Sequence, residues 1–531
     1  MALSHYLLAG LGIGFGALLT TGTLHAKPSP AMSEKHPNIV VILADDLGYG
    51  DVSCLNPDHG KIRTPNLDRL ASQGVVFSNA HSNSAVCTPS RYGLLTGRYS
   101  WRTPLQMAAL MGYNVPLISE NRLTVGKMLQ DSGYSTACIG KWHLGLGWQS
   151  RNSSMAEMPA PPGEIPSDEV DCSKPILHGP TTRGFDYFYG ITASLDIPPF
   201  IYIENDRTVG EPSVQRTVYI RTGPAHPDFE PEDVLPTFTR KSVEYIQKNS
   251  VDAKKGKPFF LYLAINSPHT PLVPTKAWKG KSGLGDYGDY VMETDWAVGE
   301  VVKSLDKYGL TKNTLVLVTS DNGCAPYIGV ADLEAKGHYP SADSRGYKGD
   351  SWDGGHRVPF LVRWPGVVKP NSTCGQLVSM TDIMATCAEI VGKKLPSDAG
   401  EDSTSILPLL KDRNQPVHEA IVHHSLFGCF AIRDSQWKLV LGSGSGGWAE
   451  PNDLAASEQG LPRVQLYDMK ADPGETTNLQ DKHPEVVERL LKLLEKYVTE
   501  GRSTTGKSQK NDFPVDIWKT PRCDVIVHPA K

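Results

Sequence analysis

Four apolar runs in this sequence end in groups of residues that can carry chemistry. The runs and their polar ends are residues 38–44 before Asp45 and Asp46, 135–139 before Lys141 and His143, 259–265 before His269, and 314–319 before Asp321 and Asn322. Continuous apolar runs of this length are typical of parallel strands that are buried on both faces. In such sheets ligands bind beyond the carboxyl ends of the strands, so we expect these polar groups to meet in one site. For any one run alone, a capped and solvated strand end is the alternative.

The carboxylates and the amide at these ends offer only oxygen ligands. Asp45, Asp46, Asp321 and Asn322 would therefore select a hard cation, Ca²⁺ or alternatively Mg²⁺, over zinc. Three carboxylates gathered in one place would also repel one another without such an ion. Taken separately, Asp45 and Asp46 could form a turn of solvated acids, and residues 321–323 could form a hairpin or helix-start turn.

The sharpest local pattern is Cys87-Thr-Pro-Ser-Arg91, followed by Leu94-Leu-Thr-Gly97-Arg98. Thr88 and Pro89 are typical of a helix start and Gly97 of a helix end, which predicts a short helix with Cys87 at its N-terminus. The helix dipole would lower the pKa of a thiol there. Arg91 lies four residues on and shares a helix face with Cys87. The alternatives are a buried structural cysteine and a surface ion pair for the arginine.

This stretch resembles the signature of the type I, formylglycine-dependent sulfatases, an arylsulfatase-like family of the alkaline phosphatase superfamily. The resemblance extends over residues 36–500 and includes Gly140-Lys-Trp-His-Leu-Gly145, the segment 346–359 with Lys348, and the segment 466–475. Asp353 stands where many members of the family have glutamate. We expect that departure to lie outside the reacting centre.

The resemblance implies a modified nucleophile. A maturase would oxidise Cys87 to formylglycine, whose hydrate attacks sulfur and forms a sulfated enzyme as the alcohol leaves. One oxygen of that hydrate would complete the coordination of the cation held by Asp45, Asp46, Asp321 and Asn322.

The resemblance also implies roles for the basic residues. Lys141 and Lys348 would clamp the sulfate, and Arg91 would orient the hydrate. His143 would remove the proton that releases sulfate, and His269 would bind the substrate and protonate the leaving alcohol. His81, His423 and His424 are interpreted as structural histidines.

The elements that must position these residues indicate a doubly wound α/β fold. Strands and helical segments alternate along residues 36–415, and the family resemblance implies a mixed, mostly parallel sheet of the alkaline phosphatase type. Residues 416–531 are expected to form a smaller C-terminal α+β subdomain, with two strands in 429–441 and an amphipathic helix over 484–497. We expect long loops at 150–182 and 206–240, on the rim of the site.

Composition and charge narrow the classes of function. The chain has 531 residues, 39% apolar and 21% charged, with a net charge of -5, which indicates a globular protein and gives no signature of nucleic-acid or anionic-membrane binding. Residues 1–26 contain no Asp, Glu, Lys or Arg and resemble a signal peptide, with a retained anchor as the alternative. No later stretch reaches membrane-spanning length. We therefore expect an exported, periplasmic or secreted enzyme without a transmembrane span.

The sequence says less about the natural substrate than about the reaction. Aromatic residues at 184–190 and 196–202 could stack on sugar rings or pack under the rim, and His338, Tyr339 and Arg345 could face the leaving group. An exported sulfatase of this pattern resembles enzymes of bacterial polysaccharide degradation, so a sulfated carbohydrate is preferred, with aryl sulfates as surrogates. The alternatives are a phosphate or phosphonate ester hydrolase of the same superfamily and a non-catalytic carbohydrate-binding relative.

Overall fold

A computed structural model describes residues 36–151 and 160–519 of the chain. The predicted signal peptide, residues 1–26, lies outside the described residues. The described residues form one compact unit. No helix of the described ranges is both long enough and apolar enough to cross a membrane.

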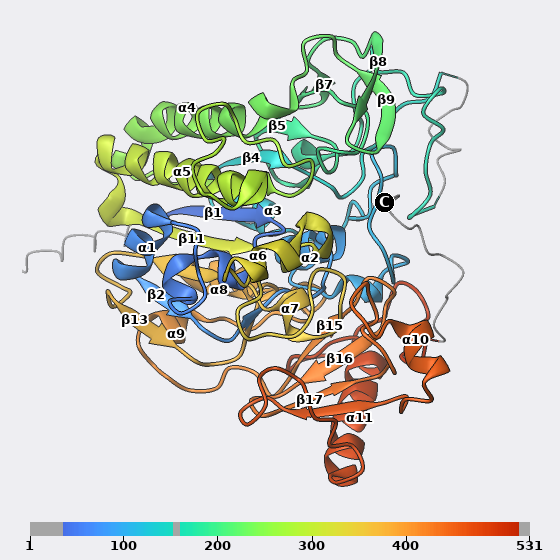
Figure 1. The fold of residues 1–531 in the computed structure, drawn as a ribbon. Coiled ribbons are helices and arrows are strands. Elements are labelled where there is room, and N and C mark those ends of the chain that lie inside the picture. Colours follow the sequence, from blue (N-terminus) through green and yellow to red (C-terminus); the bar gives the residue numbers. More distant parts are fainter. Residues whose placement is uncertain (1–35, 152–159, 520–531) are drawn as a thin grey trace, which may run out of the picture. The chain divides into compact units, whose positions relative to one another are not determined.

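A ten-stranded mixed sheet carries the fold (Figure 1), in the order β13-β2-β12-β11-β1-β10-β4-β5-β6-β7. In chain order its strands are β1 (Asn38–Asp45), β2 (Val75–Phe77), β4 (Ser135–Lys141), β5 (Tyr187–Ile191), β6 (Ile203–Glu204), β7 (Arg207–Thr208), β10 (Phe259–Pro268), β11 (Thr314–Ser320), β12 (Phe360–Arg363) and β13 (Ser372–Cys374). The central strands β11, β1, β10, β4 and β5 pair in parallel, and β12 joins them antiparallel to β11. The predicted mixed, mostly parallel doubly wound sheet is confirmed.

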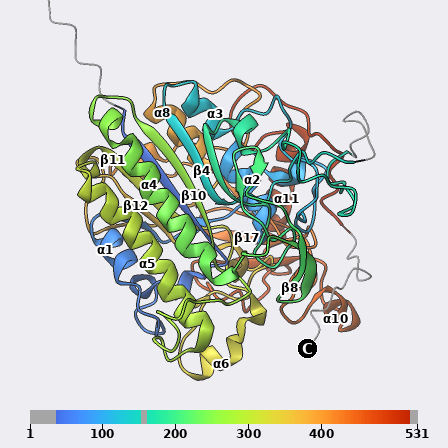
Figure 2. The ribbon, with the colours of Figure 1, turned by 90° about the horizontal axis from the view of Figure 1, so that it is seen from above.

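Helices cover both faces of this sheet. Helices α1 (Pro65–Ser72), α4 (Val234–Lys254) and α5 (Gly285–Lys307) pack on one face, where α4 and α5 lie side by side (Figure 2). Helices α2 (Cys87–Thr96), α3 (Val125–Gln130) and α8 (Asp382–Ile390) pack together on the other face. The remaining helices are α6 (Val330–Ala335), α7 (Asp353–His356), α9 (Leu407–Leu410), α10 (Asp453–Glu458) and α11 (Pro484–Thr499).

The central strand β1 shows why its sequence is a continuous apolar run. Ile39 and Leu43 point into the core beneath α2 and α3, whereas Val40 and Ile42 point into the core beneath α4 and α5. Successive side chains of a strand face opposite sides, so a strand covered on both faces needs apolar residues at every position. All eight residues of β1 are buried, including Asp45 at its end.

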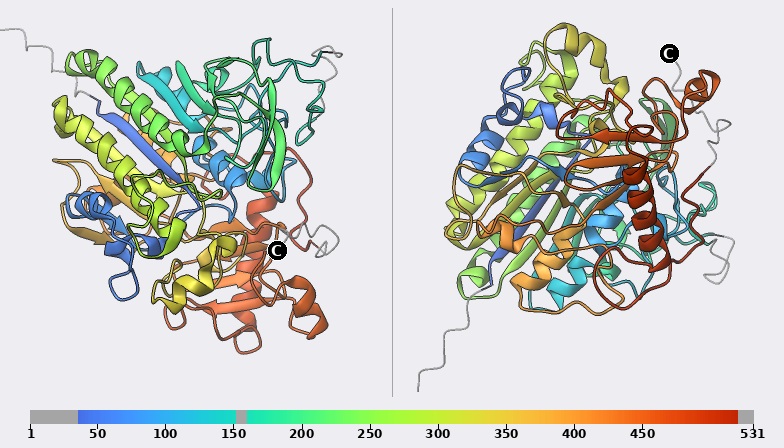
Figure 3. Two further views of the ribbon diagram at one scale, coloured as in Figure 1. Left: turned by 45° about the horizontal axis from the view of Figure 1, so that its top comes forward. Right: turned by 90° about the horizontal axis from the view of Figure 1, so that it is seen from below.

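A separate four-stranded antiparallel sheet follows, in the order β15-β16-β17-β18, beside the large sheet (Figures 1 and 3). Its strands are β15 (Ile421–His424), β16 (Phe430–Arg433), β17 (Trp437–Val440) and β18 (Gln465–Asp468). Helix α11 packs on β16 and β17, with Leu490 and Leu494 fully buried in their shared core. The predicted strands and amphipathic helix of a small C-terminal α+β unit are therefore present.

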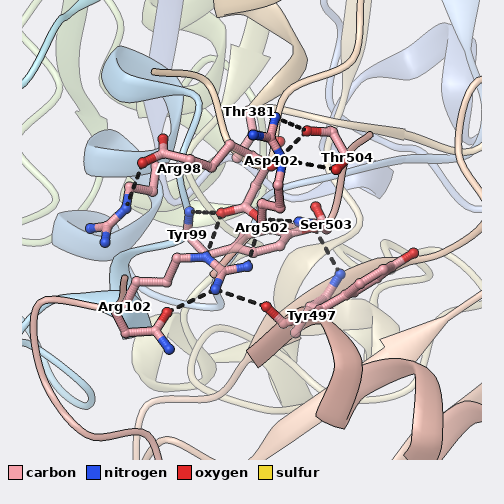
Figure 4. Close-up of polar contacts among 12 residues, drawn as sticks. Arg98, Tyr99, Arg102, Thr381, Asp402, Tyr497, Arg502, Ser503 and Thr504 are labelled. Atoms are coloured by element: carbon pink, nitrogen blue, oxygen red, sulfur yellow. Dashed lines mark hydrogen bonds and ion pairs between the residues drawn. The ribbon is translucent and has the colours of Figure 1, made fainter. Parts of the chain in front are cut away.

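A buried ion pair between Arg102 and Asp402 connects the segment that follows α2 to this C-terminal part through hydrogen bonds. Arg102 donates from Nε and Nη2 to the two carboxylate oxygens of Asp402, each at 2.8 Å, and from Nη1 to the Tyr497 carbonyl oxygen at 3.0 Å. Asp402 also accepts hydrogen bonds from the backbone N–H groups of Tyr99 and Ser503 (Figure 4). The helix that begins with Cys87 is thus braced at its far end by residues near the C-terminus.

The prediction of a long loop at residues 206–240 is wrong in part. Residues 206–240 contain a β-hairpin, β8 (Val214–Val218) and β9 (Arg221–Ala225), and the start of α4 at Val234. The prolines that suggested a loop break the apolar period without preventing either element. Pro224 lies in the edge hairpin strand β9, Pro236 lies in the first turn of α4, and the others fall outside these elements. In the described part of 150–182 we find only a short 3₁₀ helix that begins at Pro180, as expected for a loop. The two-stranded sheet of β3 (Ala80–His81) and β14 (Val378–Ser379) completes the strands.

Candidate active site

The strands that end in reactive residues are neighbours. In the sheet order β11-β1-β10-β4 all pairs are parallel, so the four carboxyl ends meet at one edge. Asp45 ends β1, Lys141 ends β4, His269 follows β10 and Asp321 follows β11. The convergence predicted from the apolar runs is present.

The acidic residues and Asn322 form one buried group. The Asp46 N–H donates to Asp321 Oδ1 at 3.1 Å, and Asn322 Nδ2 donates to Asp46 Oδ1 at 2.7 Å. Asp46 adopts a left-handed backbone conformation with φ of 63°, which turns the chain sharply after the strand. Asn322 Oδ1 is buried and has no hydrogen-bond partner among the described residues.

Three cations lie against the three carboxylates. Lys141 Nζ binds the two oxygens of Asp45 at 2.9 and 2.7 Å, and Lys348 Nζ lies 2.8 Å from an oxygen of Asp46. Arg91 donates from Nη2 and Nε to Asp321 Oδ2, at 2.6 and 3.1 Å. Arg91 also reaches Asp45 Oδ1 at 3.4 Å and donates to the Lys141 carbonyl oxygen at 3.1 Å. The formal charges of these six buried side chains cancel.

The pKa values follow from this arrangement. Burial alone would raise the pKa of Asp45, but Lys141, His269 and Arg91 together hold that pKa below its ordinary value. For Asp321, burial and the neighbouring charge of Asp45 outweigh its cations and raise the pKa. Burial opposes the charge of Lys348, yet Asp46 holds the pKa of its ammonium well above the ordinary value. Lys348 therefore remains a cation in spite of burial.

Lys348 reaches the carboxylate group from a segment outside the sheet. A close backbone contact holds that segment in place. A Cβ at Gly323 would lie 1.9 Å from the Gly354 carbonyl oxygen, so only glycine fits there. Across this contact the Gly323 N–H donates to the Gly355 carbonyl oxygen at 3.0 Å, and the Lys348 N–H donates to the Cys324 carbonyl oxygen at 2.8 Å. The Asp-Asn-Gly turn after β11 thus positions its own two side chains, Asp321 and Asn322, and also Lys348.

Cys87 is the first residue of α2, and all ten residues of that helix are buried. The predicted helix and its left-handed stop at Gly97 are confirmed. The predicted direction of the thiol pKa is wrong. Burial raises the pKa of Cys87, and the nearby Lys141 and Lys348 offset that effect only in part, while Asp321 and Asp45 add to it. The helix terminus does not outweigh the loss of water around the sulfur.

His143 and His269 each form a hydrogen bond through one ring nitrogen, and the nitrogen that remains is a different one in each ring. His143 has a backbone φ of 56°, and its Nε2 lies 2.7 Å from the Leu110 carbonyl oxygen. Since a carbonyl only accepts, Nε2 carries the proton, and the buried Nδ1, which has no partner among the described residues, presents its lone pair. His269 donates from Nδ1 to the Thr270 carbonyl oxygen at 2.5 Å, which leaves Nε2 facing Asp46 Oδ2 at 3.7 Å.

Comparisons with known proteins show the family of this chain. A model of the sulfatase family matches residues 37–393, and one of the C-terminal region of N-sulphoglucosamine sulphohydrolase matches residues 348–500. The chain belongs to the sulfatase family. It is therefore a sulfuric ester hydrolase, as the Cys87 pattern predicted.

Individual relatives cover nearly the whole of this sulfatase. An N-acetylgalactosamine-6-O-sulfatase of Bacteroides thetaiotaomicron is 35% identical, over 91% of this chain and 97% of the relative. Human arylsulfatase A is 31% identical, over 93% of each protein. A solved structure from a study of glycosaminoglycan metabolism by Bacteroides thetaiotaomicron superposes with a TM-score of 0.75 at 34% identity, over 87% of this chain and 99% of that one. Ps i-CgsB in complex with k-i-k-neocarrahexaose superposes with a TM-score of 0.65 at 26% identity, over 89% and 95%.

The sulfatase has a cavity of about 290 Å³ above this centre. Its lining includes the predicted residues Cys87, His143, His269 and Lys348. Lining residues that sequence reasoning missed are the loop 107–111, Ser194, Arg221, Tyr327, Leu426, Phe427 and Trp448. Nothing in the sequence marks them, because they come from segments distant along the chain that meet only in the folded protein.

Other expected substrate contacts lie elsewhere. His338 is fully buried and binds Asp51 Oδ1 through Nε2 at 2.9 Å. Arg345 stacks on Trp352, with its guanidinium carbon 3.5 Å from the ring centroid. Neither of them lines the cavity, and nor does Tyr339. The aromatic residues of 184–190 pack mainly into the core, whereas Asp196 and Ile197 of the second aromatic segment do line it.

Among the described residues of this sulfatase, two buried groups bring potential metal ligands together. Ligand atoms of Asp45, Asp46 and His269 lie within 4.8 Å of one another, beside the unpartnered oxygen of Asn322. This oxygen-rich donor set fits a hard divalent cation. His81, His356 and His423 form the second group, which offers only imidazole nitrogens, and His356 Nε2 lies 3.2 Å from Lys438 Nζ. Asp353 pairs with Arg433 and Lys438, away from the cavity lining.

Proposed function

We propose that this sulfatase is an exported enzyme that hydrolyses sulfate monoesters of a carbohydrate to the alcohol and inorganic sulfate. The observation that carries the proposal is the joint placement of Cys87, Lys348, His143 and His269 in the lining of one cavity, above the carboxylate group. A sulfate ester in that cavity would meet a nucleophile position, cations and two proton-transfer groups at once. The predicted signal peptide supports export.

We infer that Cys87 is the residue that a maturase oxidises to formylglycine. When hydrated, that aldehyde supplies a hydroxyl for attack on sulfur. The buried thiol, with its raised pKa, is a poor nucleophile as it stands, which is consistent with a need for conversion.

Asp45, Asp46, Asp321 and Asn322 would hold Ca²⁺, with Mg²⁺ as the alternative. A cation bound there supplies a Lewis acid beside residue 87. The oxygen donor set and the unpartnered Asn322 Oδ1 support this assignment. Residue 87 would itself contribute a ligand oxygen after conversion.

Cationic side chains bind and orient the anionic ester. The ammonium groups of Lys141 and Lys348 lie on Asp45 and Asp46, so their positions are set before substrate arrives. Asp321 fixes the position of Arg91, and Arg91 orients the substituent at position 87 toward the bound sulfate. Since these charges are buried, their attraction for sulfate is little screened by water.

The histidines move protons at defined atoms. His143 Nδ1 accepts a proton, because Nε2 is committed to the Leu110 carbonyl oxygen. The pKa of His143 is held well below its ordinary value by burial and by the charges of Lys141 and Arg91, so the ring is a neutral base. His269 Nε2 donates to the oxygen of the leaving alcohol, since its Nδ1 is committed to the Thr270 carbonyl oxygen.

A carbohydrate is favoured over an apolar alcohol because the cavity wall combines polar and aromatic side chains. Ser194, Asp196 and Arg221 lie in the same lining as Trp448. A sugar presents hydroxyls and an apolar ring face together, which matches such a wall. The N-acetylgalactosamine-6-O-sulfatase and the neocarrahexaose complex among the relatives support the same class.

The experiment is a panel of sulfated mono- and disaccharides with free sulfate as the readout, together with peptide mass spectrometry across Cys87 after co-expression with a maturase. We expect sulfate release from at least one sugar, and a peptide in which one oxygen replaces sulfur and two hydrogens. Paired sulfate and phosphate esters of one alcohol test the alternative hydrolase. A clear preference for phosphate, or full activity with an unmodified thiol, would overturn the proposal.

A further inference from the structure

The hairpin β8–β9 brings an arginine to the wall of the catalytic cavity. Arg221 is the first residue of β9, directly after the hairpin tip, and its guanidinium pairs with the carboxylate of Asp196. Both residues line the cavity that also contains Cys87 and His269. Neither belongs to the group of carboxylates and cations at the strand ends.

The position of Arg221 is determined by backbone contacts between the hairpin and the segment that carries Asp196. Phe200 and Ala225 form a parallel bridge, in which the Phe200 N–H donates to the Pro224 carbonyl oxygen at 2.9 Å and the His226 N–H donates to the Phe200 carbonyl oxygen at 3.0 Å. A rigid support of this kind allows a long side chain to serve as a defined contact.

The two members of the pair differ in exposure. The Asp196 side chain is only 8% exposed, whereas that of Arg221 is 33% exposed. Arg221 donates to Asp196 Oδ2 and to no other described residue, and the buried Asp196 Oδ1 has no hydrogen-bond partner among the described residues. The carboxylate therefore holds the guanidinium and offsets its charge, while several N–H donors of Arg221 remain for a ligand.

An aromatic wall belongs to the same cavity. Tyr327 and Trp448 meet edge to face with ring centroids 5.7 Å apart, and Phe427 lies in the lining with them. A ring that carries hydroxyl or amide oxygens could pack its apolar face on these aromatics and accept hydrogen bonds from Arg221. Since the pair carries no net charge, it favours neutral acceptor oxygens over a further anionic group.

We propose that Arg221 binds the sugar of the leaving group and that Asp196 positions it, so that the pair selects a sugar ring with neutral acceptor oxygens beside the scissile sulfate. This inference rests on the proposed function. It adds the contact by which the enzyme distinguishes a sugar sulfate from a simple aryl sulfate.

The test compares two substrates, N-acetylgalactosamine 6-sulfate and 4-nitrophenyl sulfate, in the full-length matured enzyme. For Arg221→Ala we expect kcat/KM on the sugar to fall about 10- to 100-fold, mainly through KM, because one or two hydrogen bonds to a charged group are lost. On the aryl ester we expect a change below about 3-fold.

Two further variants separate recognition from a folding defect. Arg216→Ala removes another arginine ion pair of the same hairpin, with Glu230, outside the cavity lining, and should leave the ratio of the two activities unchanged. Asp196→Asn should reproduce the KM effect, and the double variant Asp196→Asn/Arg221→Ala should be no worse than Arg221→Ala alone.

Three outcomes would overturn the inference. Equal losses on both substrates in Arg221→Ala would assign the pair to support of the catalytic residues, and no loss on either would remove it from substrate contact. Additive losses in the double variant would show that Asp196 does not act through Arg221. A wild-type enzyme that cleaves the aryl ester but no sugar sulfate would refute the proposed function itself before any variant is compared.

Discussion

The ammonium of Lys141 binds both carboxylate oxygens of Asp45, and neither side chain is exposed to solvent. Lys141 comes from the end of β4 and Asp45 from the end of β1, with β10 between them in the sheet. The ammonium that we propose to attract the anionic ester is therefore held in place by an acid of the proposed metal group. Under that proposal, sulfate binding and metal binding are coupled through this one contact.

Replacing the ammonium tests that coupling. Lys141→Met should lower kcat/KM by at least about 100-fold, because the ester loses a fixed positive charge in a site that excludes water. Lys127→Met is the control, since Lys127 is half exposed and pairs only with Asp131. Initial rates on an aryl sulfate measure both variants, and comparable rates would contradict the role given to Lys141.

Removal of the divalent ion should destabilise the folded enzyme. Only the folded chain brings Asp45, Asp46 and Asp321 together, so an ion held there binds the folded state, and a ligand at 1,000 times its Kd contributes about 4 kcal/mol to stability. We expect a chelator to lower the melting temperature in calorimetry and to abolish activity, with both restored by Ca²⁺. Identical melting curves with and without chelator, in protein that contains no metal by elemental analysis, would refute the site.

Loss of the proposed base should separate the release of the two products. In His143→Ala no group at the Nδ1 position can accept the proton, so we expect a burst of alcohol close to one equivalent per enzyme with sulfate release lagging behind. Stopped-flow detection of 4-nitrophenol and a sulfate assay measure the two products. Wild-type steady-state turnover without a burst would remove His143 from this step.

The buried ion pair between Arg102 and Asp402, beyond the end of helix α2, should stabilise the folded protein. Arg102→Met leaves the buried carboxylate of Asp402 without the arginine that, against the effect of burial, holds its pKa below the ordinary value. Breaking a buried pair in this way costs about 3–5 kcal/mol. Urea unfolding measures the loss, and Arg413→Met, at an exposed position, is the control. A midpoint equal to that of the control would show that the ion pair does not contribute.

A buried histidine should make stability depend on pH. Burial, with a smaller effect from Lys519, lowers the pKa of His424 to about 3. Below pH about 6.5 the unfolded chain therefore binds a proton that the folded state does not, and stability falls as pH falls, by up to about 1.4 kcal/mol per pH unit. His424→Gln should lose less stability than the wild type between pH 6.5 and 5. Parallel losses in chemical denaturation would contradict the assignment.

The clustering of the proposed site residues could be predicted because these residues follow local patterns. Apolar runs that end in Asp45 or Asp321 mark buried parallel strands, and parallel strands bring their ends together by their geometry alone. Cys87 and Arg91 lie on one short helix with recognisable start and stop residues, so that their spacing places them on one face.

The other features of the site depend on the tertiary structure alone. The pKa of Cys87 depends on how deeply its helix is buried, and the free nitrogen of His143 depends on a carbonyl oxygen 33 residues away at Leu110. Arg221 and Trp448 line the cavity only because the β8–β9 hairpin and the C-terminal unit pack around it. The proposed catalytic residues at strand ends are positioned by the backbone hydrogen bonds of the sheet, and the strands that form these bonds are recognisable in the sequence as apolar runs. The substrate wall is made of contacts between distant loops, which leave no periodic trace in the chain.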